Sequence, residues 1–70
     1  MAQVKVYFDQ TGNTLTVWFG EPQEEYTAEE TGDEIILMKD RAGRVIGFEK
    51  LNFVVPKSTR LQVAFETLAA

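Results

Sequence analysis

Cysteine and histidine are both absent from this 70-residue chain, and Ser58 is its only serine. Without cysteine the chain forms no disulfide, and without either residue type it lacks the usual ligands of a structural zinc ion. The same absences remove the nucleophile and the base of serine-type and cysteine-type catalytic triads. We therefore expect a protein that is not an enzyme, with no catalytic residue, no metal site and no cofactor.

Long apolar stretches are also absent: none approaches the roughly 18 residues of a membrane helix, and the first ten residues lack the pattern of an export signal. The formal net charge of −4 disfavours nucleic acid as a partner, because binding to the phosphate backbone depends on lysine and arginine. The lack of cysteine suits a reducing compartment. We expect a cytoplasmic protein that binds neither membrane nor nucleic acid.

The length of the chain limits how well it can stabilise itself. Residues 1–70 form one small domain, because a shorter piece would not bury a core. A single core of this size rarely contributes more than about 3–5 kcal/mol, and neither disulfides nor zinc can add to it here. Self-association is then the remaining source of stability, and a homodimer is expected.

What the sequence does contain is strand-forming residues at a period of two. Apolar and polar residues alternate over residues 4–9 and 14–19, whereas residues 35–38 are apolar throughout, as in a central strand. Residues 45–55 are rich in β-branched and aromatic side chains, and Pro56 ends that run. These patterns predict an all-β (or β-rich α+β) fold, a small antiparallel β-meander of about five or six strands.

The segment 58–68 fits two patterns. Apolar residues at every second position from Leu61 to Phe65 favour a strand. The same segment also presents one apolar helix face, with Ser58 as a suitable N-cap. The strand is the preferred interpretation, and a short helix remains open.

Two segments share a turn pattern: aspartate, two variable residues, then glycine. In the hairpins that we expect around Asp9 with Gly12, and around Asp40 with Gly43, the carboxylate accepts amide hydrogens of the turn. The glycine then takes the left-handed conformation. A phosphate-binding loop is the alternative for "KDRAGRVIGFEKL", but it requires glycines that open a helix, and this stretch continues as a strand.

A strand pattern places alternate residues on opposite faces of the sheet. If Val17 faces the core, then Trp18 faces away from it, as does Tyr7 on the neighbouring strand. Trp18 is then either core or an interface anchor, since tryptophan is enriched in binding hot spots. The second apolar face is covered either by the chain's last segment or by a partner subunit, and we favour the partner.

Acidic residues concentrate in one region with no lysine or arginine inside it. The six members are Glu24, Glu25, Glu29, Glu30, Asp33 and Glu34. One interpretation is a solvated edge strand and turn. The other is a docking site for a basic protein, with Glu24, Glu25, Glu29 and Glu30 as candidate interaction residues alongside Trp18 and Tyr7.

The order of elements adds a family resemblance. The stretches "VYFD", "TLTVWF", "EEYTAEETGDEIIL" and "KDRAGRVIGFEKL" together resemble the family known as domain of unknown function 2283 (DUF2283), over about residues 3–53. This resemblance implies a β-rich fold and brings no established activity. Some members are encoded beside small toxin-like proteins, so the resemblance also implies a neutralising, antitoxin-like role.

Two hypotheses of function follow. The first is a non-enzymatic protein-interaction module, a homodimer whose acidic strand and aromatic face meet another protein that carries a basic surface. The second is a small-ligand-binding protein with a pocket near Trp18 and Tyr7.

Overall fold

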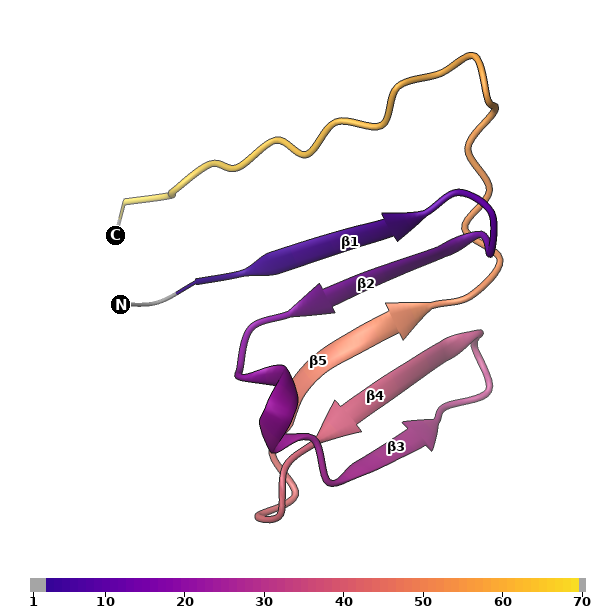
Figure 1. Ribbon diagram of the computed structural model, residues 1–70. Helices are drawn as coiled ribbons and strands as arrows, with labels where there is room; N and C mark the ends of the chain where they lie inside the picture. Colours follow the sequence, from indigo (N-terminus) through magenta and orange to yellow (C-terminus); the bar gives the residue numbers. More distant parts are fainter. Residues whose placement is uncertain (1–2, 70) are drawn as a thin grey trace.

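Five antiparallel strands form one sheet in the computed structural model, which describes residues 3–69 (Figure 1). They are β1 (Lys5–Asp9), β2 (Thr14–Trp18), β3 (Thr27–Glu30), β4 (Ile35–Lys39) and β5 (Val45–Lys50), with a short 3-10 helix η1 (Pro22–Glu24) between β2 and β3. The prediction of a small all-β antiparallel sheet is confirmed. Apart from η1, the described residues contain no helix.

The strands lie in the order β1-β2-β5-β4-β3. After the β1–β2 hairpin, the chain crosses through η1 to the opposite edge of the sheet and then returns through β3, β4 and β5 (Figure 1). The returning strand β5 pairs with both β2 and β4 and so becomes the central strand. This leaves β1 and β3 as the two edges of the sheet.

The strand register assigns each side chain to a face. Val17 lies opposite Val6 on one side and Phe48 on the other, so these side chains share what we call the first face. Trp18 lies opposite Gly47, which in turn lies opposite Met38, on the second face. This is the alternation expected from the sequence, with Trp18 on the side opposite Val17.

Gly47 fits this arrangement because Trp18 covers it. A Cβ atom at position 47 would lie 2.8 Å from Cε3 of Trp18 and 2.7 Å from the carbonyl oxygen of Val17. The pairing of β4 with β5 also shifts register next to Met38, opposite Ile46 and Gly47, as a β-bulge does. A glycine here thus permits both the close approach of the indole ring and the bulge.

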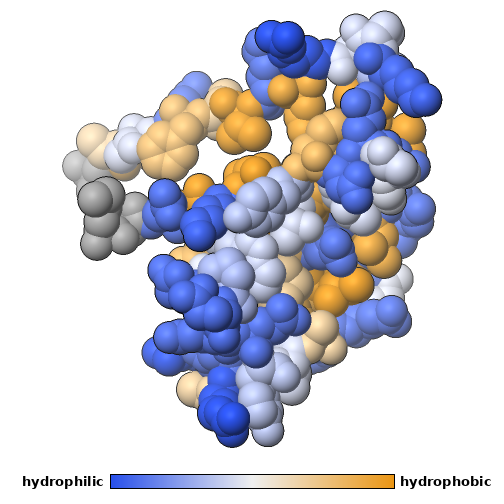
Figure 2. All heavy atoms as spheres, viewed as in Figure 1, coloured by the Kyte–Doolittle hydropathy of each residue, from blue (hydrophilic) through white to orange (hydrophobic). Residues whose placement is uncertain are grey.

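The sheet is a single layer with a small core. Met38 and Ile46 are the only hydrophobic residues of the described chain that are buried. Figure 2 shows hydrophobic side chains at the surface, including those along residues 60–69 and along the adjoining edge of the sheet, with open space between the two. Within residues 3–69 no second layer covers the faces of the sheet.

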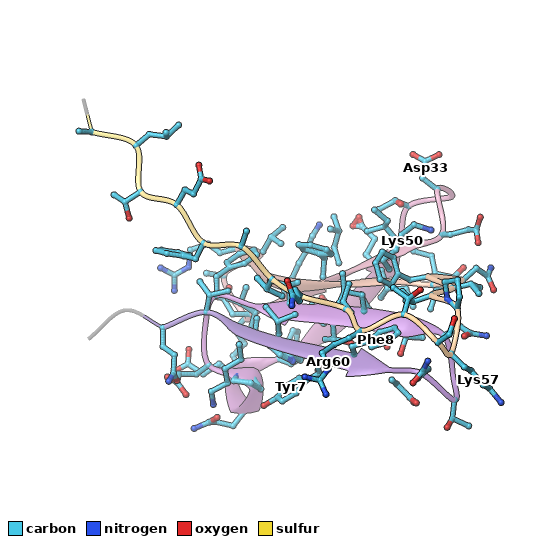
Figure 3. All side chains as sticks on the ribbon, turned by 90° about the horizontal axis from the view of Figure 1, so that it is seen from above. Tyr7, Phe8, Asp33, Lys50, Lys57 and Arg60 are labelled. Carbon is cyan, nitrogen blue, oxygen red and sulfur yellow. The ribbon has the colours of Figure 1, made fainter. Side chains whose placement is uncertain are left out.

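Residues 51–69 leave the sheet beside the β1–β2 hairpin. The Phe53 amide donates a hydrogen bond to the Asn13 carbonyl oxygen (2.8 Å), and the Phe53 ring packs edge-on against Phe8, with ring centroids 5.9 Å apart. After a turn at 56–59 the chain runs back beside β1 in the opposite direction (Figure 1) and rises out of the plane of the sheet (Figure 3).

The expectation of a strand or a short helix over residues 58–68 was wrong in this structure. After the turn, residues 60–69, which we call the extended segment, have no regular secondary structure. No strand of the described chain pairs with this backbone. Val63 and Phe65 are 66% and 83% exposed, so the segment also lacks the packing that stabilises a short helix in water.

Candidate interaction surface

The first of the two predicted turns joins β1 to β2. Oδ1 of Asp9 accepts hydrogen bonds from the amides of Thr11 and Gly12, both at 3.0 Å. The expected left-handed conformation of Gly12 was wrong, because Asn13 takes it with a φ of 58°. Glycine at position 12 instead makes room for the carboxylate, since a Cβ atom there would lie 2.9 Å from Oδ2 of Asp9.

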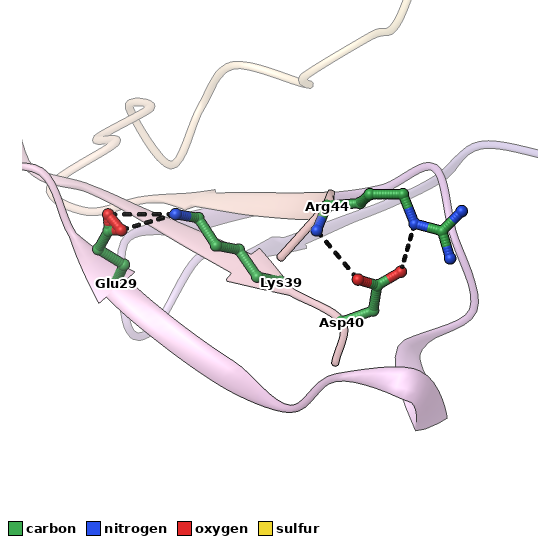
Figure 4. A network of polar contacts seen from close by, with 4 residues as sticks. All are labelled: Glu29, Lys39, Asp40 and Arg44. Carbon is green, nitrogen blue, oxygen red and sulfur yellow. Dashed lines mark hydrogen bonds and ion pairs between the residues drawn. The ribbon is translucent and has the colours of Figure 1, made fainter. Parts of the chain in front are cut away.

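The second turn joins β4 to β5 and is built on Asp40 (Figure 4). Oδ1 of Asp40 accepts hydrogen bonds from the amides of Ala42 (2.9 Å) and Arg44 (3.0 Å), and Oδ2 accepts one from Nε of Arg44 (3.0 Å). Gly43 is left-handed, with a φ of 81°. The Arg44 amide, followed by the Arg44 charge and the Ala42 amide, holds the pKa of Asp40 below its ordinary value despite burial. The contacts of Asp40 are those of a turn former.

The acidic residues lie along the β3 side of the sheet. Glu24 lies in η1 and Glu25 follows it, whereas Glu29 and Glu30 belong to the edge strand β3, in which all four residues are exposed. The name acidic edge is used here for these four glutamates. Nζ of Lys39 lies 2.7 Å from Oε2 of Glu29 (Figure 4), so one of the four charges is paired. The open backbone of β3 and its carboxylates together suit a basic partner.

The two aromatic candidates differ in exposure. Trp18 is partly buried because its ring lies on Gly47, whereas Tyr7 is 54% exposed. Trp18 therefore packs within the sheet as well as facing solvent, and Tyr7 faces solvent from the edge strand β1.

At least four hollows mark the surface of residues 3–69, and neither Trp18 nor Tyr7 lines these four. The hollow beside the acidic edge has a volume of about 420 Å³. At its rim the guanidinium of Arg41 lies 4.6 Å from the ring centroid of Tyr26, a cation–π contact that no local sequence pattern predicts. The hypothesis of a ligand pocket beside Trp18 and Tyr7 therefore stays a prediction.

Large hydrophobic residues are exposed on several elements of the described chain. Ten are at least a third exposed: Val4, Val6, Tyr7, Phe19, Tyr26, Val45, Val54, Val63, Phe65 and Leu68. Monomeric proteins rarely expose large apolar patches, and such patches mark interaction sites. No group of histidine, cysteine or acidic side chains within residues 3–69 is arranged to hold a metal ion.

A comparison with known families places the chain. The family described as "Protein of unknown function (DUF2283)" matches residues 5–53, which are more than half of the chain. The chain belongs to the DUF2283 family. The match includes all five strands and both aspartate-based turns, and it stops before the turn at 56–59 and the extended segment.

No curated protein and no solved structure matches the chain. Within residues 3–69 there is also no helix of the length and apolar character needed to cross a membrane.

Proposed function

We propose that this DUF2283 protein is a non-enzymatic interaction module that forms a homodimer and presents its acidic edge to a basic protein. The observation that carries the proposal is the small hydrophobic core: within residues 3–69 Met38 and Ile46 are the only buried hydrophobic residues, and ten large ones, in the sheet and in the segments around it, are exposed. A second protein surface would remove this apolar area from water, which is worth roughly 25 cal/mol per Å².

The acidic edge supports the choice of a basic partner. Its glutamates are exposed, and only Glu29 is paired with a cation among the described residues. Opposite charge at the rim of an interface accelerates association and excludes wrong partners more than it increases affinity. A basic toxin-like protein, neutralised on binding, fits this chemistry. The absence of cysteine suits action in the cytoplasm.

Co-purification with the product of the neighbouring gene tests the role of the acidic edge. The test variant replaces four glutamates by glutamine: Glu24→Gln, Glu25→Gln, Glu29→Gln and Glu30→Gln. The control variant raises the net charge by the same amount at exposed positions elsewhere: Gln3→Lys, Thr11→Lys, Thr59→Lys and Thr67→Lys.

The neighbouring product is expected to be basic and to bind the wild-type chain. The glutamine variant should bind at least about tenfold more weakly at low salt. The control variant should lose much less affinity, because it changes the net charge equally but keeps the contacts that the four glutamates make with the partner. Equal weakening in the two variants, or a neighbouring product that is acidic or does not bind, contradicts a specific role for the acidic edge.

A further inference from the structure

The extended segment carries the pattern of a strand but has no partner strand. Apolar residues occupy alternate positions at Leu61, Val63 and Phe65, and the last two are 66% and 83% exposed. In the described chain beyond residue 55, the only backbone hydrogen bond joins the Thr59 amide to the Pro56 carbonyl oxygen (2.9 Å). Water can satisfy the backbone of such an exposed segment, but its apolar side chains stay in water unless another strand accepts it.

The edge strand β1 offers the matching surface. Only β2 pairs with it, so one row of its amide and carbonyl groups is open. Val6 and Phe8 lie on its first face, and Val4, just before the strand, continues their alternation. Val4 and Val6 are 56% and 37% exposed.

One antiparallel register joins the two stripes without a mismatch. Phe8 and Leu61 already line the same surface hollow, and placing them opposite each other sets Val6 against Val63 and Val4 against Phe65. The same register sets Asp9 against Arg60, which have opposite charges. It places no two like charges opposite each other.

We propose that residues 60–66 of one chain add to β1 of a second copy as a sixth strand, and that the two copies exchange this strand reciprocally. This inference rests on the homodimer of the proposed function and names the contact that builds it. Exchange of an identical element between subunits closes with two-fold symmetry and is a low-cost route to a dimer.

Three observations favour a second copy over the chain's own β1. The extended segment rises out of the plane of its own sheet (Figure 3), and open space separates it from its own edge (Figure 2). The turn at 56–59, closed by one backbone hydrogen bond, supplies a hinge at which the segment can swing outward. Closure within one chain would also leave a single layer with both faces open. Exchange instead brings the sheet of the second subunit close to the first sheet, so that it can cover one of those faces.

Disulfide trapping distinguishes the two cases, because the natural chain contains no cysteine. One chain carries Val6→Cys, another carries Val63→Cys and an affinity tag, and the two are mixed and oxidised. A second pair, Tyr7→Cys with Gln62→Cys, tests the neighbouring position. Adjacent pairs of an antiparallel ladder alternate between a wide and a narrow Cα–Cα spacing, and a disulfide does not fit both equally well. Thr67→Cys with Val6→Cys is the out-of-register control.

The proposal predicts a covalent dimer of one tagged and one untagged chain for at least one in-register pair, and at least about tenfold less for the control pair. A single chain that carries both Val6→Cys and Val63→Cys should form linked dimers. A disulfide within that single chain, at the mass of the monomer, overturns the exchange in favour of closure on the chain's own β1. Failure of both in-register pairs overturns the register.

A second variant keeps the test independent of the disulfide. Val63→Asp with Phe65→Asp alters side chains that are largely exposed in the subunit, so each subunit should still fold, with an unchanged β-type circular dichroism spectrum. Its dimer should dissociate at least about 100-fold more readily, because reciprocal exchange then loses the burial of four apolar side chains, two from each subunit. Val54→Asp, at a residue that is 69% exposed and outside the segment, is the matched control.

The outcomes separate this inference from the proposed function. A wild-type dimer that the double variant leaves intact overturns the strand exchange while the homodimer stands. A wild-type chain that sediments as a monomer overturns both.

Discussion

Single glycine and aspartate residues determine the shape of this sheet. The ring of Trp18 lies where a side chain at position 47 would begin, so Gly47→Ala should destabilise the fold by about 1–3 kcal/mol through overpacking. Urea denaturation measures the change. Thr27→Ala on the exposed edge strand is the control and should stay within about 0.5 kcal/mol of the wild type. A Gly47→Ala variant as stable as the control would show that the indole does not hold this position.

Asp40 should make the stability of the protein depend on acid pH. Because the pKa of Asp40 is lower in the folded chain, its contribution is present above the ordinary aspartate pKa and is lost as the pH falls toward the lowered pKa. Asp40→Asn should therefore be less stable than the wild type at pH 7, and the difference should shrink below about pH 5. Urea denaturation across this range measures both, with Asp33→Asn as a control that removes a charge from another turn. A difference that is independent of pH contradicts the assignment.

An ion pair between Lys39 and Glu29 joins β4 to the edge strand β3. Side chains of Lys39 and Glu29 remain 26% and 52% exposed, so water and salt screen their attraction. Glu29→Gln should change the free energy of unfolding by no more than about 1 kcal/mol, and the change should disappear near 1 M salt. A loss of several kcal/mol, unaffected by salt, would mean that this pair holds the edge strand in place.

The strands themselves could be predicted from the sequence because alternation and turn residues are local signals. Residues 35–38 and the turns at Asp9 and Asp40 are cases in which the nearest neighbours in sequence determine the conformation. The order of the strands could not be predicted, since β5 returns to β2 from a distance in sequence and only the packing of the whole sheet selects that pairing. In the first turn Asn13, not Gly12, is the left-handed residue. The sequence does not decide between the two, because both residue types tolerate that conformation.

The candidate surface was predictable in part, because some of its features are also local signals in the sequence. The run from Glu24 to Glu30 and the opposite orientation of Trp18 and Val17 follow from composition and period. The contact of Arg41 with Tyr26 joins separate elements, and no local pattern encodes it. The extended segment shows the limit most clearly: its alternation at Leu61, Val63 and Phe65 indicates a strand, but no strand of the described chain pairs with it.

At the scale of the whole molecule, ten large hydrophobic side chains of residues 3–69 are at least a third exposed, and monomeric proteins rarely expose large apolar patches. Sedimentation equilibrium of the natural chain at micromolar concentration tests this directly. We predict a species of about twice the 7.9 kDa mass of one chain. A stable, folded species of 7.9 kDa at these concentrations would contradict the proposal that a second subunit covers the sheet.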